Sequence, residues 1–500
     1  MIERKWWTLI AVSVATFMLL LDITVVNVAL PSIRRELGAS FTDLQWVVDA
    51  YTLTLAALVL TAGSLADRLP DPTFLNLARA VQGVGGAVMF AVSLALIAQE
   101  FKAGRERGMA MGAYGATIGI AVAIGPLIGG ALTDGLGWRS IFYLNVPIGL
   151  AAIAITYLRL RESRDPNATR VDWLGVASFS AALFCLVLAL VRGNHEGWGS
   201  ALIVSLFAGA TVLLVAFIVI ERRVAEPMLP LGVFGRRAFT GVQLAAFAIS
   251  GSMFALFLYL TLYLQNYLGY SPLQAGIRYL PITVASFIAA PIAGVLLSRV
   301  QARVLLCVGL AGVGLGLLLM ADIHASSHWT TLLAGFLIAG AGIGLVNPVI
   351  ADVAVSVVAK ERSGMAAGVN DTFRQVGVSV GIAVWGAIFV GRGAEKVREL
   401  AAGTPAASGD HPRQLLEATS VGNLHQVLSA VPDSARHTVR IAAREGFLAG
   451  LNDVLTLGAL LSFAGAVLAL WLVREREIER GPTEPEEKGI SERVSEPAPA

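Results

Sequence analysis

A single carboxylate, Asp22, interrupts the apolar run that begins at Trp6 and continues to Pro31. An acidic side chain at membrane depth costs several kcal/mol unless a partner, water or a function holds it there. A carboxyl group that gains and loses a proton within a membrane is suited to a proton relay. The six histidines all fall between the apolar runs. Asp22 is therefore the leading candidate for a proton carrier.

A cation, Arg79, lies early in a later apolar run at residues 74–98. An arginine within a membrane should find a carboxylate or a water-filled cavity, and Asp22 is the natural partner. Two interpretations stay open for this pair. It couples proton movement to transport, or it is a structural pair near the end of a helix.

Further polar side chains within the apolar runs are candidates for lining a substrate cavity. They are Asn27, Asp49, Gln82, Gln265, Asn347, Asp371 and Arg374. Each has an ordinary alternative. Asp49 is compatible with a helix cap, Asp371 and Arg374 have the i, i+3 spacing of a pair on one helix, and amides commonly hydrogen-bond between helices.

Enzyme chemistry finds no support in the sequence. No Gly-rich loop ending in Lys-Ser or Lys-Thr is present, so we expect the proton motive force, not ATP, to be the energy source. No His/Cys cluster indicates a catalytic metal, and we expect no cofactor. The two cysteines, Cys185 and Cys307, lie in apolar runs and favour ordinary packing roles over a disulfide.

Composition predicts the elements that must position these residues. The 500-residue chain is 56% hydrophobic and 14% charged, whereas a soluble protein has about 25% charged residues. Repeated apolar runs of about 20 residues predict membrane-spanning helices and an all-α polytopic protein. The thirteen predicted spans are 6–30, 44–66, 74–98, 109–133, 139–158, 172–191, 200–220, 239–268, 275–298, 302–321, 330–351, 366–391 and 447–473.

Basic residues between the spans predict the orientation. Clusters at 4–5, 102–107, 159–170 and 474–476 read as cytoplasmic by the positive-inside rule, although Arg34 and Arg35 dissent. The N- and C-termini are then cytoplasmic. We divide the chain into an N-terminal helical bundle (1–158), a two-span insert with its linkers (159–237), a C-terminal bundle (238–473) and a disordered tail (474–500). The C-terminal bundle includes an extracytoplasmic loop at 392–446.

An internal repeat indicates that one span is missing. Residues 106–112 resemble 361–368, and residues 63–68 resemble 294–299. The two offsets differ by about 24 residues, the length of one membrane span. Arg68 and the 102–107 cluster both read as cytoplasmic, yet only the span 74–98 separates them. We expect a helix to be absent after Arg68, with inverted topology downstream as one consequence.

Several motifs, together with the repeated halves, resemble the 14-span drug:proton antiporter branch of the major facilitator superfamily. The run from Leu21 to Pro31 is similar to the first-helix signature of that branch, and the stretch from Arg79 to Ala87 to its fourth-helix motif. The two spans at 172–220 are similar to its central insert. The resemblance implies a two-bundle transporter in which Asp22 and Arg79 couple proton movement.

Two further motifs imply gating residues. Asp67 and Arg68 match the start of the loop motif that braces the gate, but the remainder of that motif is replaced by Leu69, Pro70 and Asp71. The fifth-helix antiporter motif is matched by Gly112, Gly125, Pro126, Gly129 and Gly130. Glycines permit close helix packing and proline permits bending, so a rocking helix and a purely structural crossing both fit.

The sequence as a whole predicts a proton-coupled exporter of amphipathic drugs or toxic organic compounds that works by alternating access. We expect a monomer in a bacterial inner membrane, with small-molecule substrate, protons and lipid as partners and no nucleic acid. Two alternatives remain. One is a dedicated exporter of a metabolite, antibiotic or lipid, and the other is a truncated, transport-inactive membrane protein.

Overall fold

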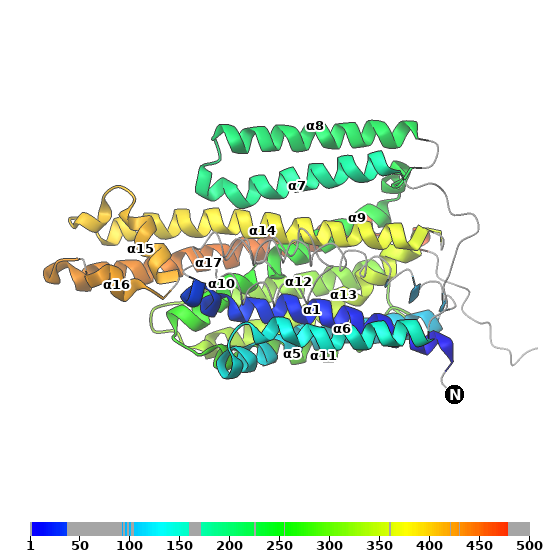
Figure 1. The fold of residues 1–500 in the computed structure, drawn as a ribbon, viewed down its shortest axis with the longest axis horizontal. Helices are drawn as coiled ribbons and strands as arrows, with labels where there is room; N and C mark the ends of the chain where they lie inside the picture. Colours follow the sequence, from blue (N-terminus) through cyan, green and yellow to red (C-terminus); the bar gives the residue numbers. More distant parts are fainter. Residues whose placement is uncertain are drawn as a thin grey trace, which may run out of the picture.

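The computed structural model describes residues 3–37, 93, 96–97, 100–101, 105–159, 172–224, 227–254, 256–359, 362–420, 422–429 and 431–478. Long helices run side by side along the longest dimension (Figure 1). Ten helices in the described part of the chain are long and apolar enough to cross a membrane. We call the face at which the first helix begins the inner face and the opposite face the outer face.

The N-terminal bundle contains three described helices. They are α1 (Arg4–Leu37), α5 (Arg105–Leu136) and α6 (Ser140–Arg159). Helix α1 packs against both of the others. The tight turn between α5 and α6 contains Gly137, which has a φ of 83° that favours glycine.

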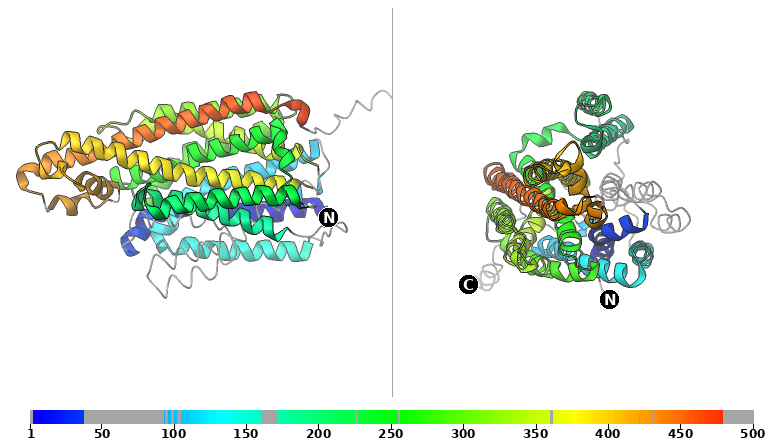
Figure 2. Two further views of the ribbon diagram at one scale, coloured as in Figure 1. Left: turned by 90° about the horizontal axis from the view of Figure 1, so that it is seen from above. Right: turned by 90° about the vertical axis from the view of Figure 1, so that its left-hand side faces the viewer.

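Helices α7 (Trp173–Glu196) and α8 (Ala201–Arg223) form the predicted insert. Asp172 caps α7 by accepting a hydrogen bond from the Gly175 amide at 2.8 Å. The pair lies at the edge of the molecule, with α7 packed on α14 (Figures 1 and 2). Large apolar side chains on α8 are exposed, which suits contact with lipid.

The C-terminal bundle begins with a long, interrupted span. It consists of α9 (Arg237–Ile249), the π-helix η2 (Ser250–Phe254), α10 (Leu256–Leu262) and the π-helix η3 (Tyr263–Tyr267). The Trp385 indole donates a hydrogen bond to the Gly251 carbonyl at 2.7 Å. A side chain from α14 thereby satisfies backbone in the first π segment, where the regular hydrogen-bond pattern changes.

The other spans of this bundle are regular α-helices. They are α11 (Pro272–Leu296), α12 (Ala302–Met320), α13 (Leu333–Ser356), α14 (Ser363–Leu400) and α17 (Asp433–Leu472). A continuous buried core joins them to the outer half of α1 and to the start of α6. Short 3₁₀ helices cover Leu231–Gly235, Trp329–Leu332 and Pro405–Ala407.

Helices α1 and α5 begin at the same face. Lys5 forms an ion pair with Glu106 at 2.5 Å near the inner face, and Arg139 after α5 pairs with Glu36 at 2.8 Å near the outer face. The inversion that we considered from the sequence is therefore wrong for the described helices. The predicted span 44–66, most of 74–98 and the expected join near Arg68 lie outside the described residues. The absence of a third helix stays a prediction.

The connection at 392–446 is largely helical instead of an irregular loop. Helices α14 and α17 continue beyond the other helices and are joined by α15 (His411–Ser420) and α16 (Leu424–Ser429). A separate apolar core that includes Val397, Leu415 and Val439 holds these segments together. The hydropathy windows missed them because short amphipathic helices are polar on average.

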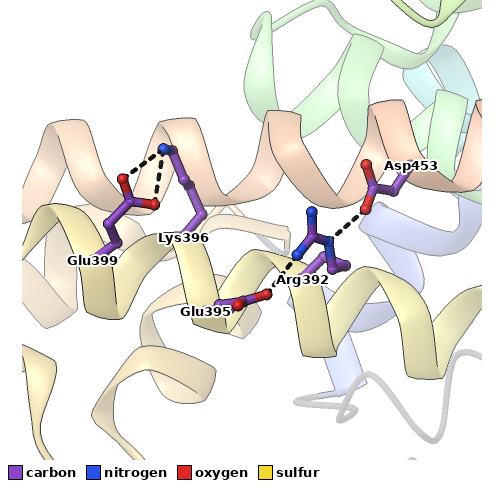
Figure 3. Close-up of polar contacts among 5 residues, drawn as sticks. All are labelled: Arg392, Glu395, Lys396, Glu399 and Asp453. Carbon is purple, nitrogen blue, oxygen red and sulfur yellow. Dashed lines mark hydrogen bonds and ion pairs between the residues drawn. The ribbon is translucent and has the colours of Figure 1, made fainter.

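Ion pairs on the surfaces of α14 and α17 mark where these helices become water-exposed (Figure 3). Arg392 contacts Asp453 and Glu395, each at 2.6 Å, and Lys396 contacts Glu399 at 3.0 Å. Arg392 and Glu395 are more than half exposed. Exposed pairs contribute about 0–1 kcal/mol, so these residues indicate solvation more than stability.

The C-terminal tail starts later than the sequence indicated. Residues 474–478 are folded, with a 3₁₀ turn at Glu475–Glu477. Glu477 accepts a hydrogen bond from the Ala238 amide at 2.8 Å, and Ile478 is buried in the main core. The prediction of disorder from residue 474 is wrong for these five residues.

Candidate transport site and outer gate

Asp22 is buried in α1 and has an amide partner on α6. The side chain is 3% exposed, and its Oδ1 accepts a hydrogen bond from Asn145 Nδ2 at 2.7 Å. Asn145 is itself 2% exposed. This buried hydrogen bond joins α1 to α6 in the interior of the N-terminal bundle.

A second buried polar group lies in the C-terminal bundle, where three helices meet. Arg374 on α14 donates hydrogen bonds to Asn347 Oδ1 on α13 at 2.9 Å and to Asn370 Oδ1 at 3.2 Å. Asn370 in turn donates to Gln243 Oε1 on α9 at 2.9 Å. Gln243, Asn347 and Asn370 are each at most 5% exposed. We call these four residues the amide–arginine cluster.

Asp371 lies beside this cluster. Its interaction with Arg374 is electrostatic, but its Oδ2 atom is buried and has no hydrogen-bond partner among the described residues. The guanidinium instead bonds to the amide oxygens of Asn347 and Asn370. Asp371 and Arg374 therefore form an electrostatic pair on one helix, as their i, i+3 spacing indicates, while the guanidinium donates its hydrogen bonds to amide oxygens.

The last two glycines of the antiporter motif face different helices. A Cβ atom at Gly129 would lie 2.9 Å from Val25 Cα on α1, within the N-terminal bundle. A Cβ atom at Gly130 would lie 2.6 Å from both Leu273 Cα and the Pro272 carbonyl oxygen on α11. Gly130 therefore permits close contact between the two bundles near the outer face.

Three hydrogen bonds join the outer ends of the two bundles. Asp134, one turn after Gly130, accepts hydrogen bonds from Ser271 Oγ at 2.9 Å and the Leu273 amide at 3.1 Å. A carboxylate at the N-terminus of α11 is favoured by the helix dipole. Gln265 donates to the Val28 carbonyl on α1 at 3.0 Å. We call this set of contacts the outer gate.

Near the inner face an apolar cluster also joins the bundles. Leu9 and Tyr114 of the N-terminal bundle pack with Val355 and Ala367 of the C-terminal bundle, and Ile97 and Phe101 belong to the same cluster. Tyr114 is also within electrostatic range of Asp371 and Arg374. Contacts between the bundles therefore occur on both sides of Asp22.

Several predicted site residues are not placed. Arg79, Asp49, Asp67, Arg68 and Gln82 lie outside the described residues. Asn27, Gly112 and Pro126 lie in described helices, but the surroundings of their side chains are not described. Gly125 is buried in α5. The proposed pairing of Asp22 with Arg79 stays a prediction.

Three functional candidates are not among the residues that the sequence indicated. They are Asn145, Gln243 and Asp134. An amide inside a span was the available signal for Asn145 and Gln243. Asp134 offered none, since an acid at the end of a span is common.

Comparisons with known proteins decide the family. The family model of the Major Facilitator Superfamily matches residues 69–382. This chain belongs to the major facilitator superfamily. It is 36% identical to the puromycin resistance protein pur8 of Streptomyces alboniger, over 78% of this chain and 82% of that protein. It is 31% identical to the tetracenomycin C resistance and export protein of Streptomyces glaucescens, over 96% and 94% of the two chains.

A solved structure agrees with the superfamily fold. A bacterial homologue of the human lysosomal transporter Spinster, in an inward-facing and occupied conformation, matches with a TM-score of 0.57. The match covers 96% of this chain and 99% of that chain at 15% identity, which shows the fold alone. The prediction of an all-helical, multi-pass transporter of the drug-efflux type is confirmed, while the number of spans stays a prediction.

Proposed function

We propose that this superfamily member is a proton-coupled exporter of amphipathic organic compounds in a bacterial inner membrane, and that it is not an enzyme. The observation that carries the proposal is the burial of Asp22 against Asn145. The relatives named for antibiotic resistance and export support the direction and substrate class. A carboxyl group buried within a membrane span is a candidate proton carrier, and its bond to Asn145 links it to a second helix of the same bundle.

The contacts between the bundles suggest how protonation is coupled to movement. Transport requires the outer gate and the inner cluster to open alternately around a central site. Removing the charge of Asp22 changes the relative free energies of the two arrangements, and a bound substrate changes them as well. One charge moved through a potential of 100 mV contributes about 2.3 kcal/mol to such a cycle. We assign substrate contacts to the amide–arginine cluster and Asp371, which lie in the C-terminal bundle, across from Asp22 in the N-terminal bundle.

The test is dye export by the full chain in vesicles. We expect efflux of a lipophilic cationic dye that depends on an imposed pH gradient and stops when a protonophore is added. Asp22→Asn should lose this dependence, whereas Asp322→Asn, at an exposed side chain outside the bundles, should retain it. Gradient-dependent efflux by Asp22→Asn at the wild-type rate would show that Asp22 has no part in the mechanism. Wild-type efflux that does not depend on the pH gradient would overturn proton coupling.

The alternatives give different results in the same assay. A dedicated exporter would move one compound and show no competition between unrelated dyes. A transport-inactive chain would move none. The ion pair between Lys5 and Glu106 supports an intact orientation of α5. A cysteine at the exposed Met109 should thus be labelled from the inner side, and labelling from the outer side would contradict that orientation.

A further inference from the structure

We propose that the inner face carries a binding site for the phosphate group of an anionic phospholipid, formed where α12 begins and α17 ends. A pocket of about 380 Å³ lies there, lined by Gln301, Arg303, Arg474, Glu475 and Arg476. Three arginines against one acid give the lining an excess of positive charge. This site is separate from the transport site and does not depend on the proposed function.

Antiparallel packing of α12 and α17 brings the arginines together. Ser462 Oγ donates to the Leu310 carbonyl at 2.8 Å, and a Cβ at Gly314 would contact Phe463 and Ala459. In this register the start of α12 lies level with the end of α17. Arg303 and Arg474 therefore line the same pocket although they lie far apart in the sequence.

The folded end of the chain holds the pocket in shape. Val473 and Ile478 are buried, and Glu477 bonds to the Ala238 amide at the start of α9. On the other side, Arg303 Nε donates to Gln301 Oε1 at 2.7 Å. None of the three arginines forms an ion pair with another described residue. Their remaining guanidinium donors are suited to phosphate oxygens, which arginine binds in a fork-like geometry.

The position along the membrane favours a lipid over a soluble phosphate. The 19-residue helix α12 is about as long as the hydrocarbon layer is thick, which places Arg303 at headgroup depth. Exposed apolar side chains occur near the same ends of both helices, including Val308 (56% exposed), five residues after Arg303, and Trp471 (66% exposed), three residues before Arg474. They offer a surface to acyl chains while the arginines bind the headgroup. Basic pockets between helices on the cytoplasmic side have this property.

Native mass spectrometry of the purified full chain with added phosphatidylglycerol or phosphatidylcholine tests the proposal. The variant is the double substitution Arg303→Gln and Arg476→Gln, at two exposed side chains. The matched control is Arg222→Gln with Arg223→Gln, two exposed arginines at the inner end of α8. We expect preferential retention of phosphatidylglycerol, weakened about fivefold per lost arginine in the variant and less than twofold in the control.

Three results would overturn the proposal. Equal retention of the two lipids by the wild-type protein would remove the anion preference. An equal loss of phosphatidylglycerol retention in the variant and in the control would show that net charge, not this pocket, causes the retention. In a parallel titration, glycerol phosphate that displaces the lipid at equal concentration would identify a soluble phosphate site. The single substitution Arg476→Gln should weaken phosphatidylglycerol retention about fivefold.

Discussion

The outer gate leads to a sharp prediction about Gly130. In the closed gate, a methyl group on this residue would lie 2.6 Å from backbone atoms of Pro272 and Leu273 on α11. Backbone cannot move aside as a flexible side chain does, so Gly130→Ala should force α5 and α11 apart. Gly135, five residues later on α5, has no atom within 4 Å of the position that a methyl group would take. Gly135→Ala is thus a matched control.

The two variants separate the clash from helix propensity. Alanine favours a helix over glycine by up to about 1 kcal/mol, and both substitutions share this gain. Overpacking a close contact costs about 1–3 kcal/mol. A net penalty of about 2 kcal/mol on the closed gate would reduce its population about 30-fold relative to the open gate. Gly130→Ala should therefore favour the outward-open arrangement, and Gly135→Ala should not.

Distances between spin labels at the outer ends of α5 and α11 measure this change. Leu136 and Ile277 are exposed at suitable positions, 76% and 47% respectively. We expect the label separation to increase in Gly130→Ala and to stay at the wild-type value in Gly135→Ala. Thermal unfolding in detergent checks that the variant is folded. Indistinguishable distance distributions for two folded variants would refute the assignment of Gly130 to the gate.

Three other predictions follow from the buried and interfacial polar contacts. Asn145→Ala should leave the buried Asp22 side chain without this hydrogen bond, at a cost of about 1–3 kcal/mol, and should impair gradient-driven dye efflux. Asn145→Ser should retain part of the efflux, and unchanged efflux in Asn145→Ala would contradict the role of this amide. Arg374→Lys should impair efflux or stability because one ammonium group cannot reproduce the two contacts of the guanidinium with amide oxygens. Arg392→Lys, in the exposed ion pairs of Figure 3, should change stability by less than about 1 kcal/mol. Equal effects of the two substitutions on melting temperature and efflux would contradict this difference between the buried and the exposed arginine. Asp134→Ala should raise the labelling rate of a cysteine introduced behind the outer gate several-fold when the reagent is added from the outer side, and Asp134→Glu should give an intermediate rate. A wild-type labelling rate in Asp134→Ala would show that the contacts of Asp134 with α11 do not keep the gate closed.

The sequence predicted the helical elements well because membrane crossing depends on a local property. A run of about 20 apolar residues must satisfy its backbone internally, and this requirement needs no knowledge of neighbours. Asp22 stood out for the same reason, as a charge inside such a run. The segment 392–446 was misjudged because its helices bury apolar faces against one another and are otherwise exposed, so average hydropathy does not detect them.

By itself, then, the sequence predicted long apolar helices, which the described part of the chain confirms, and the superfamily to which they belong. Only the tertiary structure decided the partners. Asn145 lies 123 positions from Asp22, and Ser271 lies 137 positions from Asp134. Helical periodicity gives the face on which a residue lies but not the helix that packs there. That choice depends on long-range packing, which also directs Gly129 to α1 and Gly130 to α11.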